Sequence, residues 1–526
     1  MRVAVIGAGV GGLAAAADLA RRGCEVTVFE AAAAPGGKMR QIEVAGRGVD
    51  AGPTVFTMRW IFEALFADAG RRLEDHLDML PSELLARHAW RAGGRLDLFA
   101  DIGRSMEAIA AFASPEDARG YREFCARSAA IYRTLAGPFI ASERPSPLEL
   151  VRRVGAGNLG QFWRTAPLRS LWGALGAHFR DVRLRQLFAR YATYVGASPF
   201  LAPATLMLIA HVEQDGVWQV RGGMAAVARA LHGLAEAQGA RFRFGARVEE
   251  VLVDGGRAAG VRLATGEVQR AEAVLFNGDA SALGQGLLGA GARRAAPETP
   301  RARRSLSAIT WCVNAPTEGF ALAHHNVFFA EDYAEEFDAI FRRRSLCAAP
   351  TVYVCAQDRG PAAEAPAPGG AERLLVLVNA PAEGDAQALD LARHEAEAFA
   401  LLAACGLHVA RAPGRMAATT PKGFHALFPG TGGALYGRAN HGMTGSFARP
   451  GAASRLPGLY LAGGSVHPGA GVPMAAMSGR LAAARLLEDR AGERRAIVGL
   501  GLSPAAAGVT ADTSRPPAGR IRPAPT

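Results

Sequence analysis

The pattern of apolar and polar positions changes character twice along the chain. Residues 3–6 form a short β-branched run, a glycine-rich turn follows, and the alanine-rich stretch 13–22 leads to an alternating run at 25–30. This order predicts a strand, a tight turn, a helix and a second strand. Between Asp75 and Tyr194 long helical patterns predominate, and strand patterns return from residue 241 to 276. The pattern therefore predicts an α/β protein with a mostly helical unit inserted between strand-rich parts.

The longest charge-free run extends from Tyr191 to Val212. It is long enough for a membrane span, which needs roughly 20 apolar residues, but Pro199 and Pro203 interrupt it. Two interpretations stay open. The run is either a buried loop followed by a helix, or a segment that dips into a membrane or lines a lipid tunnel.

Just before this run, residues 152–194 mix arginines with aromatic side chains. Such a mixture is typical of an interfacial helix, which places rings at the headgroups and cations near anionic lipid. A helix that packs its aromatic side into the protein core gives the same pattern, so both remain open. The residues concerned are Arg164, Arg169, Arg180, Arg183, Arg185, Arg190, Phe162, Trp163, Trp172, Phe179 and Phe188.

Composition narrows the class of protein. The chain has 526 residues, half of them hydrophobic, which excludes a mainly disordered chain and predicts two or more folding units. The net charge of +11 suits anionic partners, but nearly all the basic residues are arginines, and Lys38 and Lys422 are the only lysines. Codon bias explains that imbalance as well as phosphate binding does, so we expect no nucleic-acid partner.

The six cysteines contain no CxxC pair and no zinc-type spacing to a histidine, so we expect neither a metal site nor a disulfide framework. The apolar run begins directly after Met1 and Arg2, which leaves no room for a signal peptide. We therefore expect a reducing, cytoplasmic location.

The first chemical motif lies in the N-terminal glycine turn. Gly7, Gly9 and Gly12 form a GxGxxG pattern between strand and helix, with Gly11 in the same turn. There, backbone N–H groups and the helix dipole can hold a pyrophosphate. Glu30 ends the second strand, where a carboxylate can accept hydrogen bonds from a ribose diol. The combination predicts a dinucleotide-binding site.

A second glycine motif, Pro35 to Arg40, follows at once. It resembles the corresponding motif of flavoproteins of the amine oxidase and phytoene desaturase superfamily. The resemblance implies FAD as the cofactor. Gly36 and Gly37 would let the backbone approach its phosphates, and Lys38 and Arg40 lie in the same motif, Arg40 supplying positive charge.

The C-terminal part carries further matches to this superfamily. A strand at 459–462 runs into a glycine turn, and a helix follows at 477–487. Shorter matches are Asp50 to Thr54, Gly216 to Met224, Gly245 to Val248, and Asn277 to Asp279. By resemblance, the additional FAD-binding residues are Gly52, Pro53, Thr54, Val248, Gly463, Gly464, Gly471, Val472, Pro473 and Met474.

Because both ends of the chain would build one cofactor site, the cofactor domain must be discontinuous. The resemblance implies an α/β fold in which a Rossmann-like FAD-binding domain carries an inserted substrate domain of β-sheet plus helices. We expect the FAD-binding domain at 1–75, 213–300 and 440–490, and the substrate and membrane-associating domain at 76–212 and 301–439. Residues 491–526 are rich in Ala, Pro, Gly and Arg, and we expect a disordered tail.

Within the superfamily, the block at 50–54 runs straight into a helical pattern at Val55 to Glu63. This form is similar to the hydroxyneurosporene (methoxyneurosporene) desaturases of phototrophic bacteria. The resemblance implies an FAD-dependent oxidoreductase acting on CH–CH groups, which introduces the C3–C4 double bond into hydroxylated acyclic carotenoids of the 1-hydroxyneurosporene type. Such enzymes serve spheroidene- and spirilloxanthin-type carotenoid biosynthesis for photosynthesis.

Desaturation removes a hydride, which flavin N5 can take, and a proton from the adjacent carbon. The resemblance places His467 near the flavin, where it either accepts the proton or only shapes the turn. Arg59 and Trp60 either contact the hydroxylated end of the substrate or are structural. The expected partners are a C40 carotenoid, a membrane surface bound peripherally at the inner photosynthetic membrane, and quinone or oxygen as electron acceptor.

Three alternatives remain from the sequence. The first is a phytoene desaturase acting on non-hydroxylated carotenes. The second is an amine or protoporphyrinogen oxidase-like flavoenzyme, although the setting of Lys422 does not identify the flavin-adjacent lysine of amine oxidases. The third is a carrier of prenyl lipids without redox activity, which needs no complete flavin site.

Overall fold

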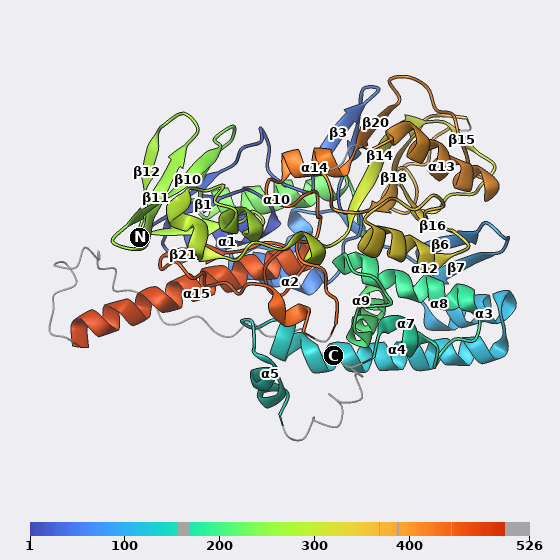
Figure 1. Ribbon diagram of the computed structural model, residues 1–526, viewed down its shortest axis with the longest axis horizontal. Coiled ribbons are helices and arrows are strands. Elements are labelled where there is room, and N and C mark those ends of the chain that lie inside the picture. The colour runs from blue at the N-terminus through green and yellow to red at the C-terminus, as the bar shows by residue number, and fades with distance from the viewer. Residues whose placement is uncertain (156–168, 368, 387–388, 443, 500–526) are drawn as a thin grey trace.

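The computed structural model describes residues 1–155, 169–367, 369–386, 389–442 and 444–499 (Figure 1). Its two main sheets lie in different parts of the molecule. In Figure 1 a parallel sheet with its covering helices occupies the left side, a larger sheet lies at the upper right, and a group of helices lies below that sheet.

The first sheet is parallel throughout and collects strands from distant parts of the chain. The glycine turn after its central strand leads into helix α1 (Val10–Arg21). A parallel sheet of this kind is buried on both faces, which explains the continuous apolar runs of its strands. The strand order is β21 (Leu459–Leu461), β13 (Ala273–Phe276), β1 (Arg2–Ile6), β2 (Glu25–Phe29) and β9 (Arg241–Arg243).

Helix α1 packs against α15 (Val472–Gly499) and α10 (Met224–Ala237). The approach to α15 is very close, because a Cβ atom at Gly479 would lie only 2.0 Å from the carbonyl oxygen of Gly11. A buried ion pair fixes the same interface. Arg480 Nε donates to Asp18 Oδ2 at 3.1 Å, and both side chains are 1% exposed.

The second sheet has seven strands and is antiparallel except where β16 meets β6. Helices α12 (Tyr333–Asp338), α13 (Leu391–Ala404) and α14 (Pro421–Leu427) belong to the same part of the chain. The strand order is β20 (Met416–Thr419), β14 (Ser307–Ala315), β18 (Glu372–Ala380), β17 (Val352–Ala356), β16 (His325–Phe329), β6 (Leu84–Trp90) and β7 (Arg95–Phe99).

A group of helices packs around a separate apolar core next to this sheet. Phe179 and Phe188 stack inside it with ring centroids 4.7 Å apart. The helices are α3 (Ile102–Phe112), α4 (Pro115–Leu135), α5 (Pro147–Val154), α7 (Leu171–Leu175), α8 (Val182–Ala189) and α9 (Leu208–Asp215).

Two further α-helices and several smaller strands complete the α-helices and β-strands of the described residues. Helix α2 (Arg59–Asp68) packs against α15, and α11 (Ala280–Gly284) follows β13. The strands pair as β3 (Gln41–Val44) with β4 (Arg47–Asp50), β5 (Met79–Pro81) with β8 (Trp218–Val220), β15 (Thr317–Glu318) with β19 (His408–Val409), and β10 (Val248–Asp254) with β11 (Arg257–Leu263) and β12 (Val268–Arg270).

The expected α/β fold with a Rossmann-like domain is confirmed. Every strand of the parallel sheet falls within 1–75, 213–300 or 440–490, and every strand of the seven-stranded sheet within 76–212 or 301–439. The domain boundaries themselves stay a prediction.

Two expectations were wrong in detail. Residues 84–99 are not helical but form the hairpin β6–β7, because Gly93 and Gly94, both at φ +99°, turn the chain between two runs that pair in the sheet. The tail was expected to begin at 491, yet α15 continues to Gly499. Arg490 bonds with Glu272 and Glu493 there, which holds that part of the helix against the domain. Residues 500–526 lie outside the described residues.

In its described part, the segment at 152–194 that mixes arginines with aromatic residues packs its aromatic side chains into the protein core. Phe179 and Phe188 are buried, Trp172 packs against Phe200 at 4.9 Å, and Arg183 pairs with Asp181. Phe162, Trp163 and Arg164 lie outside the described residues. No helix in the described part of the chain is long and apolar enough to span a membrane.

We expect the ion pair at the α1–α15 interface to be important for stability. Arg480→Met should lower the free energy of unfolding by about 3 kcal/mol, because Asp18 would stay buried without its main partner. Arg393→Met is the matched control, since it breaks the exposed Arg393–Glu397 pair on α13 and should change little. Denaturant unfolding of both variants measures this, and equal effects would contradict the expectation.

Candidate cofactor and substrate site

A large cavity of about 1270 Å³ lies where the parallel sheet, the seven-stranded sheet and the helices meet. Its lining combines glycine main chain, a few charged groups and a long apolar stretch. Most of the residues that the sequence singled out for the cofactor line this cavity.

The N-terminal glycine turn forms one wall of the cavity. Gly7, Gly9 and Gly11 line it, whereas Gly12 lies behind them, where a Cβ atom would approach the carbonyl oxygen of Gly7 to 2.1 Å. Helix α1 begins here, and no side chain caps it at Gly9, so its first N–H groups face a ligand site. Bare main chain at a helix N-terminus fits a pyrophosphate.

Glu30 lies beside this turn at the end of β2 and also lines the cavity. Its Oε2 accepts a hydrogen bond from the N–H of Ala8 at 2.7 Å, and its Oε1 accepts one from the N–H of Ala32 at 2.8 Å. The carboxylate is thus fixed in place before any ligand binds. It retains lone pairs for hydroxyl donors.

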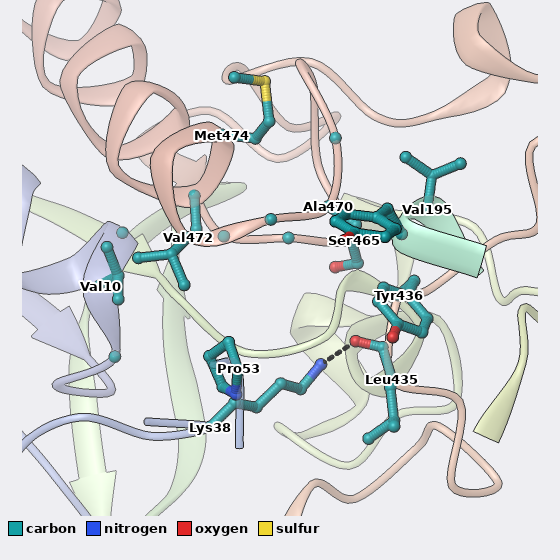
Figure 2. A pocket seen from close by; sticks show the side chains of 18 of the residues that line it. Val10, Lys38, Pro53, Val195, Leu435, Tyr436, Ser465, Ala470, Val472 and Met474 are labelled. Carbon is teal, nitrogen blue, oxygen red and sulfur yellow. Dashed lines mark hydrogen bonds between the residues drawn. The ribbon is translucent and has the colours of Figure 1, made fainter. Parts of the chain in front are cut away.

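The second glycine motif packs directly on the first. A Cβ atom at Gly37 would lie 3.2 Å from Gly9 Cα, and Gly36 and Gly37 both have positive φ. Lys38 and Arg40 also line the cavity. Lys38 Nζ donates to the carbonyl of Leu435 at 2.5 Å (Figure 2), and burial lowers the pKa of this lysine.

Residues from the middle and the end of the chain close the same space. Gly52, Pro53 and Thr54 line it, as does Val248 from β10. In Figure 2 the side chain of Val472, at the start of α15, lies on the side of the helix that faces Pro53 and Lys38, whereas Met474 points away from these two residues; all four line the cavity. The lining includes the remaining predicted residues Gly463, Gly464, Gly471, Val472, Pro473 and Met474.

Two charged residues at this end were not among the predicted site residues. Arg449 is 3% exposed and donates to the carbonyls of Tyr436, Gly464 and Arg438, and burial lowers its pKa to about 10. Burial raises the pKa of Asp279, which also lines the cavity. Asp279 could have been found from the sequence, because it belongs to the block at 277–279 that resembles the superfamily. No local pattern marks Arg449, whose position depends on tertiary contacts.

His467 does not have the position that we expected of a proton acceptor. Its side chain is 2% exposed, is absent from the cavity lining, and places Nε2 2.9 Å from the carbonyl oxygens of both Phe139 and Ser142. Nε2 therefore carries the proton and donates it to main chain. The structure supports a role for His467 in shaping the turn and not in taking up a proton from the substrate.

Arg59, Trp60 and Lys422 also lie away from the lining. Arg59 pairs with Glu63 and Glu74, and Trp60 Nε1 donates to Tyr132 at 3.1 Å, so both have structural roles. Lys422 is exposed on α14.

The rest of the cavity lining is mainly apolar. Several residues of the run Tyr191 to Val212 line the cavity. The run is a mostly buried segment followed by helix α9, which agrees with the interpretation as a buried loop plus helix, and it also contributes to the cavity wall. Other apolar lining residues come from the helices and the seven-stranded sheet, among them Leu135, Phe139, Ile140, Leu150, Val151, Leu375, Leu377, Phe424, Leu427 and Phe447.

Within the described residues, one group of potential metal ligands comes together, namely His324, His325 and Cys355. Sequence spacing missed it because the cysteine lies on β17 and the histidines lie at the start of β16. These side chains already have hydrogen-bond partners within the protein. His324 Nδ1 lies 2.9 Å from the carbonyl of Arg359, its Nε2 lies 3.6 Å from Cys355 Sγ, and His325 Nδ1 lies 2.7 Å from the Tyr353 hydroxyl.

The burial of His467 has a consequence for stability. Burial lowers its pKa to about 4 from an ordinary 6.5. Below about pH 6.5 this histidine therefore binds a proton in the unfolded chain, whereas in the folded chain it stays neutral down to about pH 4. Stability from this group is therefore lost as the pH falls from 6.5 toward 4. When the pH is lowered from 7 to 5, the free energy of unfolding of the wild type should fall by about 2 kcal/mol more than that of His467→Gln, because glutamine does not titrate.

Denaturant unfolding at the two pH values measures this difference. Comparison with the variant removes the contributions of the other buried histidines. Identical pH dependence in the two proteins would show that His467 is not held neutral.

The sequence matches the model of a protein family described as flavin containing amine oxidoreductase over residues 10–487. The chain is 55% identical to hydroxyneurosporene desaturase of Rubrivivax gelatinosus, covering 95% of this chain and 97% of the relative. It is 46% identical to hydroxyneurosporene desaturase of Cereibacter sphaeroides, covering 94% and 99%. A solved oxidoreductase from Methanosarcina mazei shares the fold, with a TM-score of 0.58 at 18% identity, covering 91% of this chain and 99% of that one. The chain thus belongs to the flavin containing amine oxidoreductase family.

Proposed function

We propose that this protein is an FAD-dependent desaturase that introduces the C3–C4 double bond into hydroxylated acyclic carotenoids of the 1-hydroxyneurosporene type. The observation that carries the proposal is the 55% identity, over 95% of the chain, to a protein named hydroxyneurosporene desaturase. The cavity supports it, since glycine main chain, charged groups and many apolar side chains line the same space.

The cofactor of the protein is FAD, and the residues present fit it. The glycine turns at 7–12 and 36–37 offer bare backbone for the phosphates, Glu30 offers a fixed carboxylate for the ribose, and the start of α15 offers a second helix N-terminus. FAD, when bound, supplies an acceptor for the hydride that desaturation removes.

The chain itself contributes positioning and exclusion of water. A polyene has almost no polar groups to hold, so apolar walls must fix its position beside the cofactor. The apolar lining also keeps water from the reacting carbons. The proton leaves from the carbon next to the one that loses hydride. His467 is buried and is absent from the cavity lining, which supports a structural role for it and not a direct contact with this carbon.

Incubation of the purified FAD-loaded protein with 1-hydroxyneurosporene, neurosporene and phytoene tests the proposal. We expect a new double bond in the hydroxylated substrate, detected by chromatography and by the shift of its absorption to longer wavelength. Conversion of phytoene alone would establish a phytoene desaturase instead. Repeating the reaction without oxygen, with and without an added quinone, distinguishes the two proposed electron acceptors.

Glu30→Gln should weaken FAD binding on the order of 10- to 100-fold, because charged hydrogen bonds to the ribose would be replaced by weaker ones. Glu25→Gln is the matched control at the exposed start of the same strand. FAD fluorescence during titration of the apoprotein measures both affinities. Unchanged affinity in Glu30→Gln would rule out the assigned role of this carboxylate.

We further propose that the protein binds the surface of the inner photosynthetic membrane from the cytoplasmic side through helix α5. Pro147, Leu150 and Val151 of this helix line the cavity, whereas Leu148 is 80% exposed. Arg152 is exposed near the end of the helix, where it can meet anionic headgroups. In Figure 1, α5 extends below the other helices. A lipid could thus pass from the bilayer into the cavity beside α5.

Leu148→Glu should weaken binding to anionic liposomes on the order of tenfold, since it removes the buried area of one leucine and adds a negative charge. Val182→Glu is the control, because Val182 is also an exposed apolar residue, at 60%, but lies on α8 and outside the cavity lining. Liposome flotation at low salt measures both. Equal losses in the two variants would contradict a specific role for α5.

A further inference from the structure

A group of polar side chains interrupts the apolar part of the cavity. Arg190, Tyr194 and Glu213 line the wall formed by the helices, and Thr54, Tyr353 and His325 line the wall next to them. We call these six residues the polar patch. An apolar polyene makes no favourable interaction with a buried charge, and burying a charged side chain costs free energy unless an opposite charge or a hydrogen-bond partner lies beside it. The polar patch therefore needs an explanation beyond packing.

Arg190 is the central cation of the polar patch. Burial alone would lower the pKa of its guanidinium, but the nearby Tyr194 and Glu213 outweigh burial and raise that pKa, so Arg190 stays charged. Its Nε is buried and has no hydrogen-bond partner among the described residues. A buried donor of this kind is expected to meet an acceptor when a ligand fills the cavity.

Glu213 does not take up this donor capacity. Its Oε2 accepts from the hydroxyl of Tyr191 at 2.7 Å and its Oε1 accepts from the hydroxyl of Tyr194 at 2.5 Å. The carboxylate thus balances the charge of Arg190, but its hydrogen bonds go to two tyrosines. Of these tyrosines Tyr194 lines the cavity and Tyr191 does not.

The polar patch extends to the cofactor end of the cavity. The hydroxyl of Tyr353 lies 2.7 Å from Thr54 Oγ1 and 2.7 Å from His325 Nδ1. Thr54 is one of the residues assigned to FAD. Burial, and to a smaller degree the charges of His324 and Arg190, holds the pKa of His325 well below its ordinary value. Arg190 is the cation of the polar patch, and it lines the same cavity as this chain of hydrogen bonds.

This position matches the chemistry of the proposed substrate. In a 1-hydroxycarotenoid the oxygen is on C1, two bonds from C3, where the new double bond begins. When C3 and C4 lie beside the cofactor, the oxygen must lie close to it as well. The polar patch begins at Thr54, so it occupies the region that this oxygen must enter.

We propose that Arg190 donates a hydrogen bond to the oxygen on C1 of the carotenoid and thereby makes the enzyme selective for oxygenated substrates. The inference rests on the proposed desaturase function. Tyr194 and Glu213 position the guanidinium, and removal of the oxygen from the substrate leaves a buried charged donor unpaired, which penalises binding of plain carotenes.

Arg190→Gln tests the proposal directly. The measured quantity is the ratio of the dissociation constants for 1,2-dihydroneurosporene and 1-hydroxyneurosporene, which both have a C1–C2 single bond and differ only in the hydroxyl group on C1. Both constants are determined with the FAD-loaded protein from the change in carotenoid absorption on binding. We expect the preference for the hydroxylated compound to fall on the order of 10- to 100-fold, the effect of losing a hydrogen bond from a charged donor. An unchanged ratio would overturn the proposal.

A pair of tyrosine variants keeps the test decisive if Arg190→Gln fails to fold. Tyr194→Phe and Tyr191→Phe each remove one hydroxyl from the same carboxylate, but Tyr194 alone of the two lines the cavity. We expect Tyr194→Phe to reduce the preference for the hydroxylated compound and Tyr191→Phe to reduce it much less. Equal effects of the two variants would assign the cluster a purely structural role.

The failure of this inference is distinguishable from the failure of the proposed function. A wild-type protein that desaturates 1-hydroxyneurosporene, combined with an unchanged ratio in the variants, overturns the role of Arg190 alone. A wild-type protein that desaturates no hydroxylated carotenoid overturns the proposed function, and the inference with it.

Discussion

The contact between α1 and α15 is the constraint on which the cofactor site depends. The N-terminal glycine turn and the start of α15 are separated by more than four hundred residues, yet both must face the same FAD. They do so because Gly479 lets α15 approach the carbonyl of Gly11 more closely than any side chain would allow, and because Arg480 and Asp18 pair between the two helices. A buried pair of this kind tolerates little displacement, so it fixes the relative position of the two helix N-termini.

The cavity changes polarity along its length, and each part is built by a different means. At the cofactor end, glycine main chain and helix N-termini supply positive potential without side chains that would occupy space. Three buried charges there, on Lys38, Asp279 and Arg449, act on one another in the low-dielectric interior. The remote end is made of leucine, isoleucine, valine and phenylalanine side chains. A flavin and a polyene need this division, because one is a charged dinucleotide and the other a hydrocarbon.

The sequence was sufficient for the features that a local pattern encodes. Gly7 to Gly12, Glu30 and the motif at 35–40 could be predicted because a phosphate-binding turn imposes the same local backbone wherever it occurs. Arg449 and the polar patch could not be predicted, since their roles arise from contacts between segments far apart in the chain. His467 shows why the sequence left two roles open for this residue. It belongs to a motif of the cofactor site, but the direction of its side chain depends on the carbonyls of Phe139 and Ser142, which the local pattern does not contain.

The high arginine content first suggested an anionic partner. In the structure, however, some of these arginines lie inside the protein, and Arg190 lines the cavity. Lysine at position 190 would lose its charge more readily when buried, because desolvation lowers the pKa of an ammonium group from a starting value well below that of guanidinium. Arg190 remains charged within the cavity, with Glu213 close enough to balance it and the two tyrosines holding the carboxylate. A permanent cation at one point of an apolar cavity lets the protein discriminate between two substrates that differ in a single oxygen atom.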